Sequence, residues 1–107
     1  SELEGRKVAV LGDMLELGPY ERGGHEMVGL RAAQVVDVLI TLGERAHMIA
    51  DAARRAGRKK TTITEFDEFD PLVEWLKNNL AKNDAVLIKG SHGLRMDRIT
   101  ALLENRP

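Results

Sequence analysis

Four short apolar runs, separated by helical patterns, restrict the fold of this chain more than any other feature of its sequence. The runs are rich in Val, Ile and Leu and do not alternate strictly with polar residues. Such runs are typical of strands that are buried on both faces, as in parallel sheets. The predicted strands are Lys7–Leu11, Val35–Leu42, Thr61–Phe66 and Ala85–Ile88.

Helices are predicted between these strands and after the last one. The clearest has an apolar face between Phe69 and Leu80, and Asp70 followed by Pro71 predicts an N-cap and a proline at the first helical position. The other predicted helices are Glu21–Gln34, Ala46–Ala53 with Gly57 as C-cap, and Arg95–Leu103. Right-handed crossovers between alternating strands and helices give an α/β, Rossmann-like fold, a doubly wound and mostly parallel sheet with flanking helices.

Length and composition indicate a single domain, residues 1–107, without a membrane span, because no apolar run approaches ~20 residues. With 16 Lys and Arg against 17 Asp and Glu, the charge gives no support for nucleic acid as a partner. The lack of cysteine excludes disulfides and thiolate catalysis and favours a cytoplasmic protein. Because the chain begins at Ser1, we expect it to be a piece of a longer protein.

The first candidate site is the loop after the first strand, residues 12–18, which carries Asp13 and Glu16. Ligands of doubly wound sheets bind outside the carboxyl ends of the strands, and three predicted strands end there in glycine, at Gly12, Gly43 and Gly90. Carboxylates at this edge can orient an amine, a ribose hydroxyl or a metal-bound water. They can equally serve as caps of backbone groups, which is the commoner use, and their spacing leaves both interpretations open.

The second candidate is the turn after the fourth strand, which contains Lys89, Gly90, Ser91 and His92. Its glycines permit close backbone approach, Ser91 offers a hydroxyl, and a following helix start favours negative charge, so an anionic or carboxylate-bearing ligand is predicted. Alternatively, Lys89 pairs with an acid at the sheet edge and Ser91 only caps a helix. The phosphate-loop and dinucleotide-binding fingerprints are both missing.

The histidines do not predict a metal site, because His25, His47 and His92 are scattered and no metal-ligand spacing occurs. A triad of Ser91, His25 and Asp13 lacks a nucleophile elbow and is not favoured.

Two stretches together resemble one protein family. They are Arg6–Gly18, followed by His25 and Gly29, and Val86–Ser91. Their G-D-M-L-E-L-G loop and lysine-glycine-serine turn are similar to those in the C-terminal domain of the Mur ligases, in particular the ligases that add D-alanyl-D-alanine to UDP-N-acetylmuramoyl-tripeptide. The resemblance extends over nearly the whole chain, including the strand at Val36–Ile40.

The resemblance implies a three-domain, ATP-dependent ligase of peptidoglycan synthesis, with ATP and Mg²⁺ bound mainly by a central domain outside this chain and no cofactor in this piece. In that family, the terminal carboxyl of the UDP-muramoyl-tripeptide is phosphorylated, and the amine of D-alanyl-D-alanine attacks the acyl phosphate. Carried over by position, Lys89, Gly90 and Ser91 lie on the dipeptide side, with Lys89 and Ser91 facing its carboxylate. Asp13 and Glu16 orient the amine or neighbouring basic groups.

Two departures from the family pattern stand out. His92 occupies a position where arginine is expected, and the Asp-x-Tyr-Asn-Ala-Asn-Pro-like segment that usually begins this domain is absent. We therefore expect the isolated chain to be inactive. Two alternatives remain, the C-terminal domain of another Mur or folylpolyglutamate-type amino-acid ligase and a non-catalytic α/β interaction domain.

Overall fold

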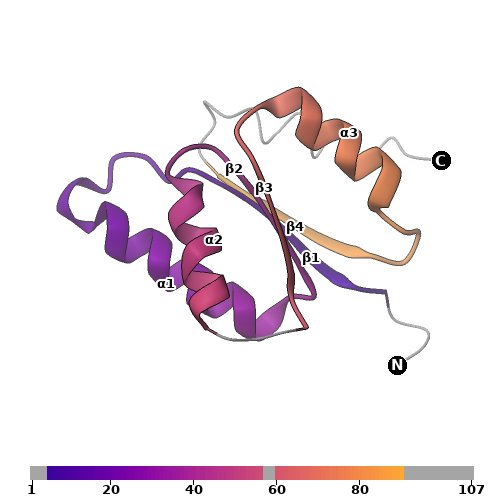
Figure 1. Ribbon diagram of the computed structural model, residues 1–107, viewed down its shortest axis with the longest axis horizontal. Coiled ribbons are helices and arrows are strands. Elements are labelled where there is room, and N and C mark those ends of the chain that lie inside the picture. The colour runs from indigo at the N-terminus through magenta and orange to yellow at the C-terminus, as the bar shows by residue number, and fades with distance from the viewer. Residues whose placement is uncertain (1–4, 57–59, 91–107) are drawn as a thin grey trace.

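A four-stranded parallel sheet forms the centre of the computed structural model, which describes residues 5–56 and 60–90 (Figure 1). The strands lie in the spatial order β3-β2-β1-β4. Their bounds are β1 Lys7–Gly12, β2 Val38–Leu42, β3 Thr62–Phe66 and β4 Ala85–Lys89. The 3-10 turn η1 (Gly18–Tyr20) and the helices α1 (Glu21–Val35), α2 (Ala46–Arg55) and α3 (Phe69–Asn79) connect them. The predicted α/β architecture with a doubly wound parallel sheet is confirmed.

Helices cover both faces of the sheet, α3 on one and the pair α1 and α2 on the other (Figure 1). Leu72 and Leu76 of α3 pack on the first face, which we call the α3 face. Ala32 of α1 and Ile49 of α2 pack on the second, the α1/α2 face. The middle strands β1 and β2 contribute apolar side chains to both faces, which explains why their sequences form continuous apolar runs.

Asp84 fastens the beginning of β1 to β4. Its carboxylate accepts hydrogen bonds from the backbone N–H of Arg6 at 3.1 Å, from Nη2 of Arg6 at 2.7 Å and from the backbone N–H of Ala81 at 2.8 Å. The hydrogen bond from the Arg6 guanidinium is the main reason why the pKa of Asp84 is lowered to about 2. The carboxylate therefore stays ionised, and the ladder between β1 and β4 begins at a fixed register.

Two predicted boundaries were wrong. The N-cap of α3 is Glu68 and not Asp70, and Pro71 is the third helical residue, where a missing N–H is harmless because the first turn has no intrahelical acceptor. The strand predicted from Val35 begins only at Val38, because α1 continues through Val35 and the apolar run spans the end of the helix as well as the strand. The predicted cap at Gly57 and the predicted helix Arg95–Leu103 lie outside the described residues.

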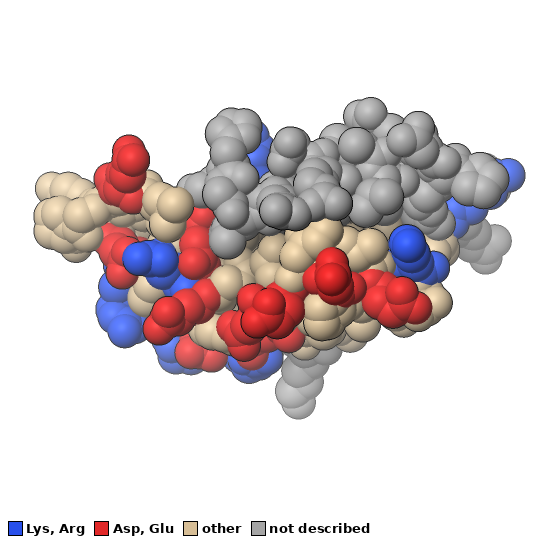
Figure 2. All heavy atoms as spheres, turned by 90° about the horizontal axis from the view of Figure 1, so that it is seen from above, with Lys and Arg blue, Asp and Glu red and all other residues tan. Residues whose placement is uncertain are grey.

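Within the described ranges, no helix is both long enough and apolar enough to cross a membrane. Acidic and basic side chains are both present on the described part of the face seen in Figure 2. That face therefore does not present a single sign of charge.

Gly29 sets the distance between α1 and α2. A Cβ atom at this position would overlap the carbonyl oxygen of Ile49 and crowd the side chain of Ala52. Gly23, in the first turn of the same helix, has nothing within 4 Å of the corresponding point. The two glycines therefore form a matched pair, one at a close helix contact and one in open space.

We expect Gly29→Ala to lower the free energy of unfolding by about 1–3 kcal/mol, because the helices must move apart to admit the methyl group. Gly23→Ala should raise it by about 0.5 kcal/mol, because alanine restricts the unfolded chain and favours the helix. Equilibrium urea unfolding of both variants measures the difference. Equal stability of the two variants would contradict the close contact.

Candidate functional site

The carboxyl ends of the strands bring the two candidate loops together. Leu11 of β1 is paired with Lys89 of β4, so the residues that follow, Gly12 and Gly90, lie beside each other. Gly12 is also paired with Leu42, which places Gly43 next to the same loop. We call this region the carboxyl edge, and it is where ligands of doubly wound sheets bind.

Asp13 is a buried carboxylate that caps a helix from outside that helix. Its side chain is 7% exposed, and Oδ1 accepts a hydrogen bond of 2.6 Å from the backbone N–H of Ala46, the first residue of α2. Its other oxygen, Oδ2, lies 3.5 Å from Nη1 of Arg45. A negative charge at a helix N-terminus is stabilised by the unpaired N–H groups and by the helix dipole. The contacts of Asp13 are thus those of a cap, the second of its two interpretations.

The absence of a side chain at Gly43 leaves room for the Asp13 carboxylate. The φ of Gly43 is +115°, and a Cβ atom there would overlap the Asp13 carboxylate. A residue with a side chain would therefore be strained in its backbone and would displace the acid at the same time. This is the physical reason for a glycine directly after β2.

His25 fastens the loop that follows Asp13 to α1. The imidazole is fully buried; Nε2 accepts a hydrogen bond of 3.0 Å from the backbone N–H of Met14, and Nδ1 lies 2.6 Å from the carbonyl oxygen of Glu21. Both contacts are satisfied by the neutral ring with its proton on Nδ1, since a carbonyl can only accept. His25 therefore orders the loop from the α1 side, as Asp13 does from the α2 side.

Arg45 connects the two ends of this network, because it contacts both Glu21 of α1 and Asp13. Its Nε donates a hydrogen bond of 2.7 Å to Oε1 of Glu21, while its Nη1 faces Asp13. The hydrogen bond with Glu21 is the main cause of the raised pKa of Arg45. The starts of α1 and α2 are thereby connected through the charged groups that surround the loop.

Three of the predicted site residues, unlike Asp13, are exposed: Glu16, Lys89 and Gly90. Glu16 lies at the tip of the loop with φ at +65°, a left-handed conformation that is uncommon for residues other than glycine. Lys89 is the last residue of β4 and is exposed, as is Gly90 after it. The ammonium of Lys89 makes no hydrogen bond or ion pair with the side chains of residues 5–56 and 60–90, so the alternative in which it pairs with an acid finds no support there.

The predicted site residues Ser91 and His92 lie outside the described residues. Their roles, and the alternative in which Ser91 only caps a helix, stay predictions. Lys89 and Gly90 nevertheless fix where that turn begins, because the pairing of β4 with β1 places it beside the loop of Asp13.

A second charged cluster at the carboxyl edge was not predicted from the sequence. His47 of α2 lies between two carboxylates, with Nδ1 2.5 Å from Oε1 of Glu65 and Nε2 2.7 Å from Oδ1 of Asp67. Arg54 contacts the other oxygen of Glu65 at 2.6 Å. Glu65 and Asp67 share a side of the strand end because side chains alternate along β3, but nothing in the sequence links them to His47, 18 and 20 residues away.

Hydrogen bonds to Glu65 and Asp67 raise the pKa of His47 above its ordinary value of 6.5. The protonated ring can donate to both carboxylates at once, whereas a neutral ring can donate to only one. The cluster is therefore an ion network that fastens α2 to the end of β3. Across residues 5–56 and 60–90, no group of three His, Asp or Glu side chains is arranged to hold a metal ion.

These features define a class of protein: a parallel α/β domain whose carboxyl edge combines an ordered acidic loop with a free lysine. Within that class the family is clear. The chain belongs to the Mur ligase C-terminal domain family, because the family's sequence model, described as "Mur ligase, glutamate ligase domain", matches residues 1–92.

The chain is also similar in sequence to individual ligases of this family. The chain is 33% identical over 104 residues, 96% of its length, to the UDP-N-acetylmuramoyl-tripeptide--D-alanyl-D-alanine ligase of Bacillus subtilis (strain 168). It is 35% identical over 91% of its length to the protein of the same name from Treponema pallidum (strain Nichols). It covers 22% and 21% of these proteins, so it spans about a fifth of the length of the curated relatives it matches.

A solved structure supports the fold. The crystal structure of MurF from Acinetobacter baumannii superposes with a TM-score of 0.70 and 23% sequence identity over 96% of this chain and 23% of that one. At this identity the likeness concerns the fold, and it agrees with the parallel α/β architecture described above.

We expect Asp13→Ala to lower the free energy of unfolding by about 2–3 kcal/mol, because it leaves the buried N–H of Ala46 without an acceptor and Arg45 without one of its carboxylates. Asp13→Asn should cost about half as much, because its amide oxygen can still accept from Ala46. Urea unfolding of the two variants measures this order. An Asp13→Ala variant as stable as the wild type would contradict the capping role.

The His47 cluster should make stability depend on pH. Because the folded-state pKa of His47 is raised, its contribution is complete below the ordinary pKa of about 6.5 and is lost as the pH rises through the higher folded value. We expect the free energy of unfolding of the wild type to fall over this interval relative to that of His47→Gln, which does not titrate. A constant difference between the two proteins from about pH 6 to about pH 9 would show that the ring is not protonated in the cluster.

Proposed function

We propose that this chain is the C-terminal domain of an ATP-dependent ligase that joins D-alanyl-D-alanine to UDP-N-acetylmuramoyl-tripeptide in peptidoglycan precursor synthesis. The observation that carries the proposal is the similarity, over more than nine tenths of the chain, to proteins that bear the name of this reaction. The G-D-M-L-E-L-G loop, which is ordered by Asp13 and His25 at the carboxyl edge, adds support from the structure.

Lys89 is the residue of the described edge best suited to bind the carboxylate of the incoming dipeptide. Its ammonium is exposed at the end of β4, and a charge-assisted hydrogen bond to a carboxylate is stronger than one between neutral groups. Gly90 beside it allows the dipeptide to approach the backbone closely. Ser91 and His92 follow in the sequence, and we assign the hydroxyl of Ser91 to the same carboxylate and His92 to the same subsite.

Glu16 is the carboxylate we assign to the amine of the dipeptide. It is exposed at the tip of the loop, and its positive φ is held in place by the anchored residues around it. Asp13 supports the same task indirectly, because both of its oxygens already contact groups of the domain. We therefore assign it to positioning the loop and not to direct contact with the amine.

The chemical demand on such a ligase is to hold an amine against an acyl phosphate while water is excluded. Lys89 and Glu16 would fix the two ends of the dipeptide, so that its amine has one orientation.

Residues 5–56 and 60–90 do not form a metal site, and we assign the binding of ATP and Mg²⁺ to the rest of the longer protein. The isolated chain is then inactive, and closure of this domain over the others completes the site. We assign the reaction to the cytoplasm, where ATP is available, and the cysteine-free sequence is compatible with a reducing compartment.

The proposal is tested by phosphate release from ATP with the full-length protein and with the 107-residue chain. We expect release only from the full-length protein and only when UDP-N-acetylmuramoyl-tripeptide and D-alanyl-D-alanine are both present. Because the acyl phosphate needs both the carboxyl donor and an amine to turn over, omission of either substrate should reduce release to background.

Other outcomes would replace the proposal. Release that depends on a single amino acid in place of the dipeptide would assign the chain to another Mur or folylpolyglutamate-type ligase. No release with the dipeptide or with any amino acid would favour a non-catalytic α/β interaction domain.

A further inference from the structure

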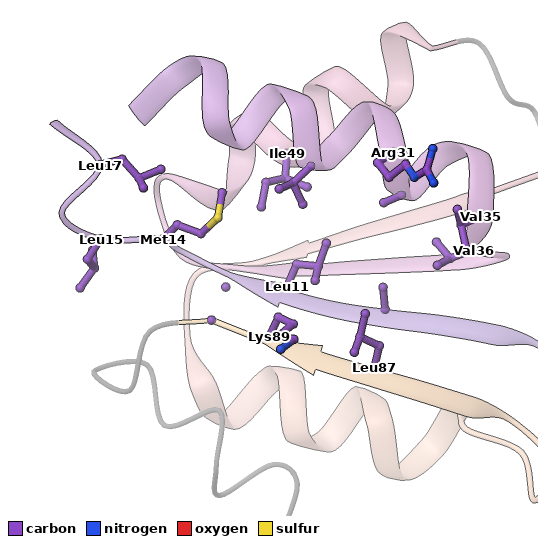
Figure 3. Close-up of a pocket in the computed structure, with 15 residues that line it drawn as sticks. Leu11, Met14, Leu15, Leu17, Arg31, Val35, Val36, Ile49, Leu87 and Lys89 are labelled. Atoms are coloured by element: carbon purple, nitrogen blue, oxygen red, sulfur yellow. The ribbon is translucent and has the colours of Figure 1, made fainter. Parts of the chain in front are cut away.

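The loop at residues 12–18 carries an apolar side chain that is exposed at the carboxyl edge. Met14 and Leu17 are half-buried, and Figure 3 shows both directed toward the helices α1 and α2. Leu15, between them, is 43% exposed, and its side chain points away from α1, to the side of the loop on which β4 lies (Figure 3). Exposed leucines are common on protein surfaces, so the meaning of this one depends on what surrounds it.

The loop holds Leu15 in a fixed position. On one side, the backbone N–H of Met14 donates a hydrogen bond of 3.0 Å to Nε2 of the buried His25. On the other side, the carbonyl oxygen of Leu17 accepts a hydrogen bond of 3.1 Å from the backbone N–H of Tyr20. A ligand that contacts Leu15 therefore does not have to order the loop first, which would weaken its binding.

Leu15 belongs to the same part of the carboxyl edge as Lys89. These two residues and Gly90 line one pocket on the α1/α2 face. Figure 3 shows Leu15 at the end of this pocket where β1 and β4 finish, whereas Val35 and Leu87 lie further along it, the latter 53% exposed on β4. An apolar side chain and a cation therefore share the end of the pocket that faces the carboxyl edge.

The dipeptide proposed as substrate carries an apolar group next to its carboxylate. In D-alanyl-D-alanine, the carbon that bears the carboxylate also bears a methyl group. A cation that binds the carboxylate therefore brings this methyl group close to the side chains beside the cation. Contact with Leu15 removes apolar surface of both partners from water, which is favourable in proportion to the area buried.

We propose that Leu15 contacts the methyl group of the carboxyl-terminal residue of the dipeptide and so makes the ligase select alanine over glycine at that position. This inference rests on the proposed function and on the assignment of the dipeptide carboxylate to Lys89. The selection is modest, because a single methyl group in an apolar contact allows limited discrimination. The contact is the same before and during the reaction, so it changes KM and leaves kcat unaltered.

The test compares three dipeptides as substrates of the full-length protein. They are D-alanyl-D-alanine, D-alanylglycine, which lacks the methyl group of the second residue, and glycyl-D-alanine, which lacks that of the first. KM and kcat are measured for the wild type and for Leu15→Ala. The matched control is Met27→Ala, because Met27 is 72% exposed on α1 and does not line the pocket. Leu15→Phe, whose ring fills the space of the methyl group, is a second variant in case Leu15→Ala does not fold.

We expect Leu15→Ala to raise the KM for D-alanyl-D-alanine and for glycyl-D-alanine by about fourfold, the effect of losing the burial of one methyl group. The KM for D-alanylglycine and all values of kcat should stay unchanged. Leu15→Phe should raise the KM for the same two dipeptides more than that for D-alanylglycine. Met27→Ala should change none of these constants.

Unchanged KM values in the Leu15 variants, or an equal rise for all three dipeptides, would overturn the proposal, since a displaced loop affects every dipeptide alike. A rise that spares glycyl-D-alanine would also overturn it, because the contact would then be with the first residue. A wild type that does not ligate D-alanyl-D-alanine would refute the proposed function and this inference with it. Ligation by the wild type without the selective change would refute the inference alone.

Discussion

The contact between the carboxylate of Asp13 and the first N–H of α2 is the interaction on which the carboxyl edge depends. It joins the end of β1 to the start of α2 across 33 residues of sequence, and it requires the glycine at position 43 to leave room for the acid. Because the carboxylate is buried, its loss would leave a polar N–H without a partner, which is costly. Arg45 and Glu21 extend the same network to the start of α1.

The edge divides its polar groups into two sets. Asp13 and His25 are buried, and their contacts are with the backbone of the domain, so they determine where the loop lies. Glu16 and Lys89 are exposed, so they are available to a ligand. An ordered loop places such groups before the ligand arrives, which lowers the entropic cost of binding. This arrangement suits the proposed binding of a small, charged dipeptide in one orientation.

Most of the fold could be predicted from the sequence because buried strands and amphipathic helices leave strong local patterns. The end of α1 at Val35 could not be predicted, because one apolar run continues from the helix into β2 and its periodicity does not show where the helix stops. The loop at Asp13 was predicted as a candidate site, but the capping role of the acid depends on its contact with Ala46, which is distant in sequence. The cluster around His47 left no local signal at all, because its carboxylate partners, Glu65 and Asp67, lie 18 and 20 residues away, at the end of β3 and directly after it. The exposed face of β4 was equally hidden, since Leu87 belongs to an apolar run that indicates burial on both sides.

The most direct test of the account is the Michaelis constant for D-alanyl-D-alanine in the full-length protein and its Lys89→Met variant, with the Michaelis constant for ATP measured in parallel. The variant keeps the length and apolar stem of the side chain and removes its charge. If Lys89 binds the dipeptide carboxylate, its KM should rise by about 10- to 100-fold, the equivalent of one charge-assisted hydrogen bond, while the KM for ATP stays unchanged. An unchanged KM for the dipeptide would contradict the assignment of the carboxyl edge to this substrate.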